Sequence, residues 1–226
     1  MRIFSVIPCM ILAGSALAQN SHYLRINAPV GTKVNLKLVT KMVAQTQKGE
    51  MGFEATMNQV LTKKSASELE WRTSFRVLSK YGRAVFAGSE RSFMDLDGTV
   101  MDMIMAPTGV MKKVRMGDIE VPSAGTPSVV FPAKPIKVGD SWPGNVDMGG
   151  QKVKITYSLA AVTTEKNNKI AIIQGKVDKG QIVKNITPIR FWVDIKNGLM
   201  ERAEAKLLIT TQGQDIRMEY RISRYR

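Results

Sequence analysis

The sequence predicts an all-β or nearly all-β protein whose antiparallel meanders form a curled sheet or half-barrel, or else a two-layer sandwich. From Gly31 onward, apolar side chains recur at every second residue, which is typical of strands with one buried and one solvated face. Turn signals such as Asp97-Gly98 and Asn197-Gly198 separate these segments. Little of the chain has the period of an amphipathic helix. An antiparallel sheet accounts for all three observations.

The alternation locates about ten strands, each bounded by a turn signal or a break in the pattern. In the segment that starts at Val34, for example, Leu36 and Leu38 alternate with asparagine and lysine. The predicted strands are residues 34–38, 51–61, 69–77, 83–93, 99–105, 153–159, 169–177, 189–195, 199–211 and 216–222.

The first eighteen residues are interpreted as an export signal. Arg2 supplies the positive charge, residues 3–14 form an apolar run, and Ala16-Leu17-Ala18 matches the small-residue cleavage pattern. Cleavage after Ala18 would remove Cys9, the only cysteine, so no disulfide and no thiolate chemistry is expected in the mature chain. No later apolar run approaches the roughly 18 residues of a membrane-spanning helix, so no transmembrane segment is expected there. We therefore predict a secreted or periplasmic protein.

Residues 19–226 are expected to form a single β domain built of two halves. The halves, about residues 31–106 and 151–226, are joined by a Pro/Gly-rich connector at about residues 107–150. Six of the nine prolines of the chain lie in this connector. Since proline cannot donate to a sheet ladder, the connector is expected to cross from one half to the other in an extended form and not as a central strand.

A short segment of the connector, residues 131–142, is the most specific motif in the sequence and reads FPAKPIKVGDSW. Its expected structural residues are Phe131, Pro132, Pro135, Gly139, Asp140 and Trp142. The prolines keep the chain extended, Gly139-Asp140 turns it, and Trp142 can fill the core between the halves. The segment resembles one found in a family of uncharacterised secreted bacterial β proteins that share the signal peptide and the two meanders. This resemblance implies a domain of unknown function and no activity.

Apolar side chains that share a strand face are the candidates for binding a ligand. Met101, Met103 and Met105 fall on one face of the 99–105 segment, and methionine side chains form an adaptable apolar surface. The alternation alone does not distinguish a ligand surface from ordinary core. The candidate ligand-facing or core residues are Phe53, Trp71, Phe75, Met101, Met103 and Met105.

Catalytic side chains are scarce. The only histidine is His22, close to the predicted mature N-terminus, so histidine-based triads and zinc sites are excluded. Residues 95–100, DLDGTV, resemble the first motif of haloacid-dehalogenase-type phosphatases, which implies Asp95 as nucleophile and Asp97 as acid/base. That family places the motif after a buried parallel strand, whereas here a polar stretch precedes it and a two-residue period follows. A tight Asp-Gly turn is favoured, and a metal-dependent hydrolase at these aspartates is the third-ranked hypothesis.

Metal binding has two weak candidates. Asp95, Asp97 and Asp102 lack the distal bidentate glutamate of a calcium loop. Three thioethers along one strand would suit Cu(I), but an adaptable apolar face explains the methionines better. No metal site and no cofactor is predicted.

The charge of the chain favours anionic partners. Removal of residues 1–18 leaves 32 basic and 19 acidic residues. A lipid or another envelope component fits this balance better than nucleic acid, because no basic stretch is interleaved with stacking aromatics. We predict an exported, non-enzymatic protein that binds an apolar or amphiphilic ligand at the cell envelope. A structural or protein-interaction module without a ligand is the alternative.

Overall fold

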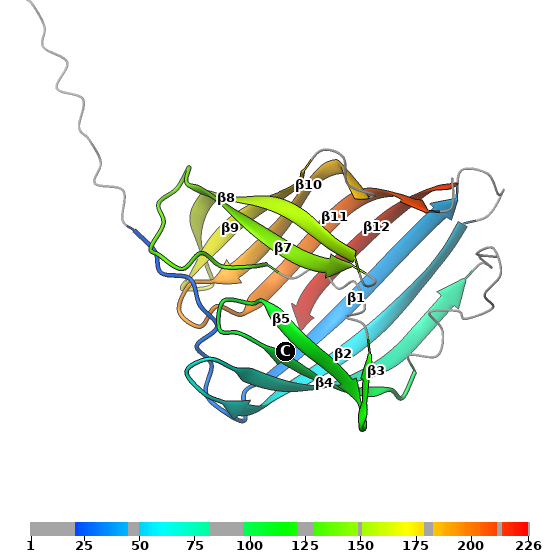
Figure 1. The fold of residues 1–226 in the computed structure, drawn as a ribbon, viewed down its shortest axis with the longest axis horizontal. Coiled ribbons are helices and arrows are strands. Elements are labelled where there is room, and N and C mark those ends of the chain that lie inside the picture. Colours follow the sequence, from blue (N-terminus) through cyan, green and yellow to red (C-terminus); the bar gives the residue numbers. More distant parts are fainter. Residues whose placement is uncertain are drawn as a thin grey trace, which may run out of the picture.

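The computed structural model describes residues 21–44, 50–81, 97–121, 129–148, 151–178, 183–211 and 214–225. These residues form twelve antiparallel strands of one curled, unclosed sheet and no helix (Figure 1). The predicted all-β class is confirmed, and the curled sheet is the arrangement that forms. The predicted signal at residues 1–18 and the predicted strand at 83–93 lie outside the described residues.

The twelve strands differ in length from three to fifteen residues. They are β1 (Lys33–Ala44), β2 (Glu50–Lys64), β3 (Leu69–Tyr81), β4 (Val100–Met105), β5 (Met111–Met116), β6 (Ile119–Val121), β7 (Ser141–Met148), β8 (Gln151–Glu165), β9 (Asn168–Val177), β10 (Val183–Asp194), β11 (Met200–Thr211) and β12 (Gln214–Tyr225). In this described part of the chain, nothing has the helical length and apolarity required to cross a membrane.

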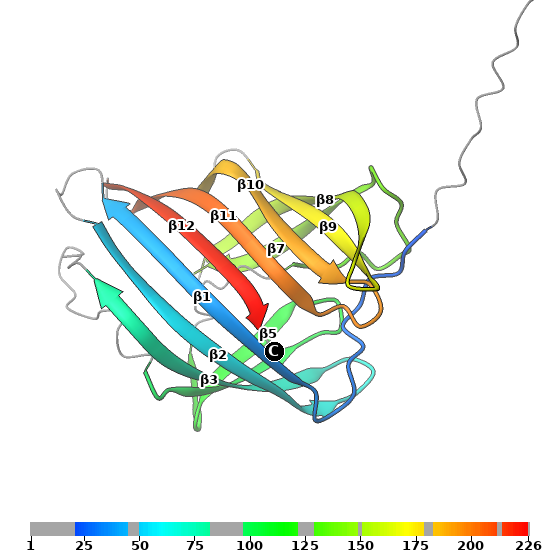
Figure 2. The same cartoon turned by 180° about the vertical axis from the view of Figure 1, so that it is seen from behind.

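Two meanders meet at the centre of the sheet. The strand order is β6-β5-β4-β3-β2-β1-β12-β11-β10-β9-β8-β7, so β1 pairs with β12 and joins the first meander to the second. The register there places Leu38 opposite Ile222 and Thr40 opposite Tyr220. Figure 2 shows the resulting unbroken back of the sheet, from β3 through β1 and β12 to β10.

The alternation in each strand sorts side chains between the inner and outer faces. On β1, Val34 and Leu36 are buried on the inner face. On its outer face, Lys37 pairs with Glu54 at 2.8 Å and Lys41 with Glu50 at 2.7 Å. Strand twist curls such a sheet around its apolar side, and the register shifts between β2 and β3 and between β10 and β11 add local twist.

The segment predicted as a connector contains three strands, all at the two ends of the sheet. β5 and β6 lie at one end and β7 at the other. Pro143 stands in β7, which pairs only with β8 among the described strands, and end strands are where sheets tolerate proline. The residues from 129 to 140 link the two ends, and residues 21–32 pack beside them. His22 and Ile136 exchange backbone hydrogen bonds of 2.7 and 2.9 Å.

The residues of the 131–142 motif differ in their burial. Phe131, Pro132 and Trp142 are buried, whereas Pro135 is exposed. Gly139 has a φ of 96°, which favours glycine, and the Asp140 carboxylate accepts a hydrogen bond of 2.9 Å from the Lys137 N–H. The motif therefore contains an extended stretch, a turn and the start of β7.

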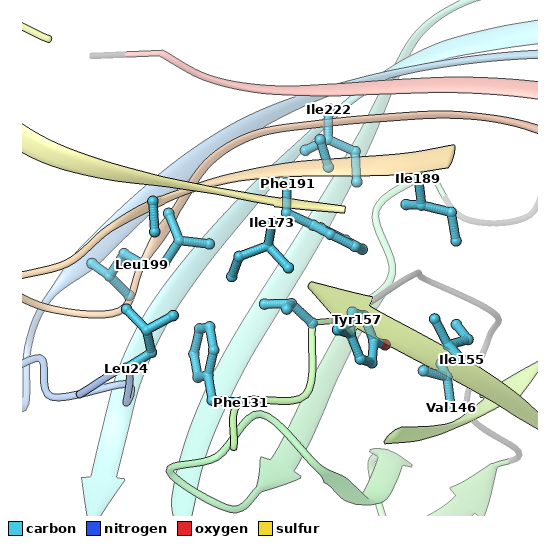
Figure 3. Packing of buried hydrophobic residues seen from close by; sticks show 14 of the residues in the cluster. Leu24, Phe131, Val146, Ile155, Tyr157, Ile173, Ile189, Phe191, Leu199 and Ile222 are labelled. Carbon is cyan, nitrogen blue, oxygen red and sulfur yellow. The ribbon is translucent and has the colours of Figure 1, made fainter. Parts of the chain in front are cut away.

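Aromatic rings pack against one another in the core of the second meander, where Figure 3 shows Tyr157 and Phe191. The Trp142 and Tyr157 ring centroids lie 5.9 Å apart, and Tyr157 lies 6.2 Å from Phe191. The Trp142 indole N–H donates to the Val130 carbonyl at 2.6 Å, so its polar edge is satisfied within the core.

Candidate apolar binding site

An apolar cavity of about 140 Å³, partly open to solvent, lies on the inner face of the first meander. Strands β1 to β5 supply most of its wall, and segments from elsewhere in the chain complete it. The lining residues are Ile26, Val34, Leu36, Met57, Gln59, Trp71, Thr73, Phe75, Met103, Met105, Gly109, Met111, Val129, Phe131, Gly198, Leu199 and Met200.

The strand register explains why the strand residues gather. Leu36 on β1 lies opposite Met57 on β2, and Trp71 on β3 lies opposite Met103 on β4. Directly opposed residues of an antiparallel pair project to the same face, so these side chains form rows across the sheet. The curl then turns the rows toward one space.

Four non-strand segments complete the wall beyond the strands: the N-terminal segment, the β4–β5 turn, the connector and the β10–β11 turn. The Ile26 N–H donates to the Pro107 carbonyl at 2.9 Å, and the Phe131 N–H donates to the Thr108 carbonyl at 2.7 Å. Gly109, with a φ of 83°, approaches the Val129 backbone where a Cβ atom would collide. These contacts hold the N-terminal segment, the β4–β5 turn and the connector together beside the cavity, and Leu24, Phe131 and Leu199 share one buried cluster (Figure 3).

Methionine is the commonest residue in the wall. Five lining residues, Met57, Met103, Met105, Met111 and Met200, come from four different strands. The unbranched thioether side chain has three rotatable bonds and adapts to irregular shapes. The cavity can therefore change shape at low cost.

None of the described residues in the wall has a charged side chain, and few have polar ones. The Gln59 side-chain amide donates to the Thr73 hydroxyl at 3.3 Å, which joins two of the polar groups. The Trp71 indole nitrogen is buried and has no hydrogen-bond partner among the described residues. An environment of this kind favours apolar matter and disfavours an ionised group.

The structure separates the six candidate ligand-facing residues. Trp71, Phe75, Met103 and Met105 line the cavity together. Met101 is buried on the same face of β4, and Phe53 is half-buried on β2 opposite Thr40, but neither lines the cavity. Phe53 lies farther along the sheet, near the small cluster of Met42 and Met51. Position along the strand, as well as its face, decides which residues reach the site.

Sequence reasoning missed several lining residues. Val34, Leu36 and Met57 belong to the same alternation, which would have identified them had every inner-face position been considered. Phe131 was assigned to architecture alone, and it also lines the cavity. Ile26 and Gly109 lie in an extended segment and a turn, where no periodic signal marks them. Leu199 and Met200 stand at the start of the predicted strand 199–211, and the alternation there does not indicate that they reach a cavity formed by the first meander.

The side chain of Asp97, in the turn that precedes β4, forms a hydrogen bond. Its carboxylate accepts a hydrogen bond of 2.9 Å from the Val77 N–H, and Gly98 has a φ of 74° in the turn. β4, which follows the turn, is antiparallel to β3, in contrast to the parallel strand and helix of the phosphatase motif. Asp95 lies outside the described residues. Among the residues that are described, no group of three His, Cys, Asp or Glu side chains could hold a metal ion.

A second hollow, of about 470 Å³, lies on the outer face across β1, β12, β11 and β10. It includes Lys206 and Arg190, which pair with Glu219 at 3.1 Å and with Glu204 at 3.5 Å. The acidic partners offset much of the positive charge, so the hollow is a weaker candidate for an anion than its lysines and arginines suggest.

No model of a known protein family and no curated protein matches this sequence. Among solved structures, the chain is similar to a DUF1329 family protein from Desulfovibrio piger, with 11% identity, 86% of each chain covered and a TM-score of 0.25. It is also similar to a LolA superfamily protein from Nitrosomonas europaea, with 10% identity, 89% of each chain covered and a TM-score of 0.26. TM-scores this low do not show a shared function.

Proposed function

We propose that the protein binds an apolar or amphiphilic molecule in the cavity on the inner face of the first meander. The observation that carries this proposal is the composition of the wall: five methionines, two aromatic strand residues and no charged side chain. Binding sites for small molecules are concave and mostly apolar, with a few polar groups that fix orientation. Gln59, Thr73 and the Trp71 indole are such polar groups.

The size of the cavity limits what enters it without rearrangement. A volume of about 140 Å³ is close to that of an engineered protein cavity of roughly 150 Å³ that binds benzene. The bound part of the ligand is therefore a compact apolar group or one end of a longer chain. A larger ligand would require the methionine side chains to move, which their flexibility permits.

The proposed place of action is the cell envelope, as the predicted export signal suggests. An exported carrier has to shield apolar matter from water, and an open, curled sheet with an apolar inner face provides that shield. The basic composition of the chain would favour approach to anionic surfaces. No cofactor enters this proposal.

Filling the cavity tests the proposal. In Met105→Trp, the larger side chain occupies space in the half-buried wall, whereas Met116→Trp changes an exposed methionine of β5 outside the cavity. With α-methylstyrene, a compact apolar molecule, as the probe in an NMR titration, we expect Met105→Trp to lower the affinity at least about tenfold, the loss of roughly 1.4 kcal/mol of binding free energy. Met116→Trp should bind like the wild type.

Thermal denaturation of both variants shows whether the fold survives the substitutions. If the probe does not bind the wild type, or binds a folded Met105→Trp as well as it binds the wild type, the cavity is not a binding site. The chain would then be better described as a structural or interaction module.

A further inference from the structure

Trp71, a residue of the cavity wall, carries a buried indole N–H group. The residue is only 4% exposed, and its indole nitrogen, Nε1, is closed off from solvent without a partner among the described residues. Buried indole N–H groups ordinarily find an acceptor, because a donor removed from water and left unpaired opposes folding. An unpaired donor at a binding site is accounted for when the ligand supplies the acceptor.

The other two tryptophans of the chain make the contrast clear. The Trp142 indole N–H donates to the Val130 carbonyl at 2.6 Å, and Trp142 is not among the residues that line the apolar cavity. Trp192 is only half-buried and stacks with the Arg202 guanidinium, 4.2 Å from its ring centroid. Of these three, Trp71 alone lines the apolar cavity.

Polar groups near Trp71 form one spot in the wall. Thr73 lies two residues farther along β3 on the same face, and Gln59 lies directly opposite Thr73 on β2. The Gln59 amide already donates to Thr73, so this pair orders part of the spot. The rest of the wall is apolar apart from backbone atoms.

One neighbour of Trp71 can make room for an acceptor. In the sheet, Trp71 is flanked by Leu61 on β2 and Met103 on β4. Leu61 is fully buried, whereas Met103 is half-buried and lines the cavity. Because the Met103 thioether is flexible, it is the strand neighbour of Trp71 that can shift to admit a ligand group without a change in the backbone.

None of the described lining residues is a lysine or an arginine, and this determines the charge of the acceptor. A carboxylate or phosphate placed beside Trp71 would lose its hydration without gaining a counter-ion from the lining residues. An uncharged carbonyl oxygen avoids that penalty and still accepts the hydrogen bond.

We infer that the ligand of this cavity carries an uncharged hydrogen-bond acceptor, a ketone, ester or amide carbonyl, which accepts from Trp71 Nε1. This inference rests on the proposed function and specifies its ligand class. The carbonyl lies at the polar spot of Trp71, Thr73 and Gln59, and the apolar part of the ligand packs on the methionines.

Two probes of the same shape test the inference. Acetophenone carries a carbonyl group, and in α-methylstyrene a CH₂ group replaces that oxygen. In ¹H–¹⁵N spectra of the purified protein, we expect acetophenone to move the Trp71 indole resonance downfield, as a new hydrogen bond does, and α-methylstyrene not to do so. The Trp142 indole, already bonded to Val130, is the internal control.

Affinities supply the second measurement. In Trp71→Phe, the affinity for acetophenone relative to α-methylstyrene should fall about three- to tenfold, the effect of one hydrogen bond between uncharged groups. Trp192→Phe, outside the cavity, should leave the ratio unchanged. Benzoate, with a carboxylate on the same ring, should not displace acetophenone at equal concentration. If Trp71→Phe does not fold, the spectra of the wild-type protein still show whether the Trp71 indole forms a hydrogen bond with acetophenone.

The outcomes separate the two proposals. If neither acetophenone nor α-methylstyrene binds, the proposed function fails and the inference fails with it. If both bind, but the Trp71 resonance does not move downfield with acetophenone and the affinity ratio is unchanged in a folded Trp71→Phe, the cavity binds apolar matter and the assigned acceptor is wrong. If benzoate competes as well as acetophenone, the acceptor is not restricted to uncharged groups.

Discussion

Buried tyrosines carry the clearest consequences at the scale of single residues. Tyr220, on β12, is 5% exposed, and its hydroxyl has no hydrogen-bond partner among the described residues. Burial raises the pKa of Tyr220 well above its ordinary value. Burial also raises the pKa of Tyr157, although a hydrogen bond with the Val130 backbone opposes the shift. Both phenols are neutral inside the protein at any pH near neutrality.

Because the Tyr220 hydroxyl is buried without a partner among the described residues, we predict that its removal stabilises the protein. Tyr220→Phe removes a buried polar group that lacks a partner, so we expect the free energy of unfolding at pH 7 to rise by about 1 kcal/mol. In the unfolded chain this phenol ionises near pH 10.0, while the folded pKa is higher. The wild type therefore loses stability as the pH rises above 10, and the advantage of the variant should widen there.

Urea denaturation at pH 7 and pH 10.5 measures both effects. Tyr157→Phe is the matched control, because it removes a hydroxyl that does have a backbone partner and should lower the stability at pH 7. A loss of more than about 1 kcal/mol in Tyr220→Phe would mean that its hydroxyl has a stabilising contact after all.

At the scale of elements, β7 is fixed by the aromatic core beneath it. Gly144 in β7 lies opposite Ile155 in β8, and a Cβ atom on Gly144 would come within 2.6 Å of the Tyr157 ring and 3.1 Å of Val130. Tyr157 is held in turn by Trp142 and Phe191. The ring has little freedom to move away, so glycine is needed at position 144 for close packing.

This packing predicts different effects for two glycine substitutions. Gly144→Ala should lower the free energy of unfolding by about 1–3 kcal/mol, the usual effect of overpacking a core. Gly175→Ala, on β9, should cost less, because its Cβ atom would lie 3.3 Å from Ile155 and 3.4 Å from Tyr157. Chemical denaturation compares the two variants, and equal losses would show that Tyr157 adjusts to the added methyl group.

At the scale of the whole molecule, periodicity predicted the strands and not their arrangement. The alternation around Val34, Met57 and Trp71 reports which side of a strand is buried, so it led to the all-β class. The pairing of β1 with β12 joins residues about 180 positions apart, and no local pattern marks it. The strands within the connector were also missed, because its prolines concealed the short pattern of β5 and the start of β7.

The part of the candidate site that strand residues form could be predicted from the sequence, and the part that other segments form could not. The face shared by Met103 and Met105 and the aromatic residues of β3 was visible in the sequence. Ile26 and Leu199 reach the cavity only because backbone hydrogen bonds join the N-terminal segment to residues 107 and 197. Whether the Trp71 indole N–H finds an acceptor is decided by its three-dimensional surroundings, and among the described residues it finds none. Sequence periodicity carries no information on this point.

The methionine-lined wall of the first meander is the proposed binding site for an apolar molecule. The most direct measurement is a titration of protein labelled with ¹³C at the methionine methyl groups, with α-methylstyrene as the ligand. We predict saturable shifts for the five lining methionines and no comparable shifts for Met42, Met51 and Met116, which lie outside the wall. Shifts confined to those three methionines, or no saturable shift at all, would contradict the account.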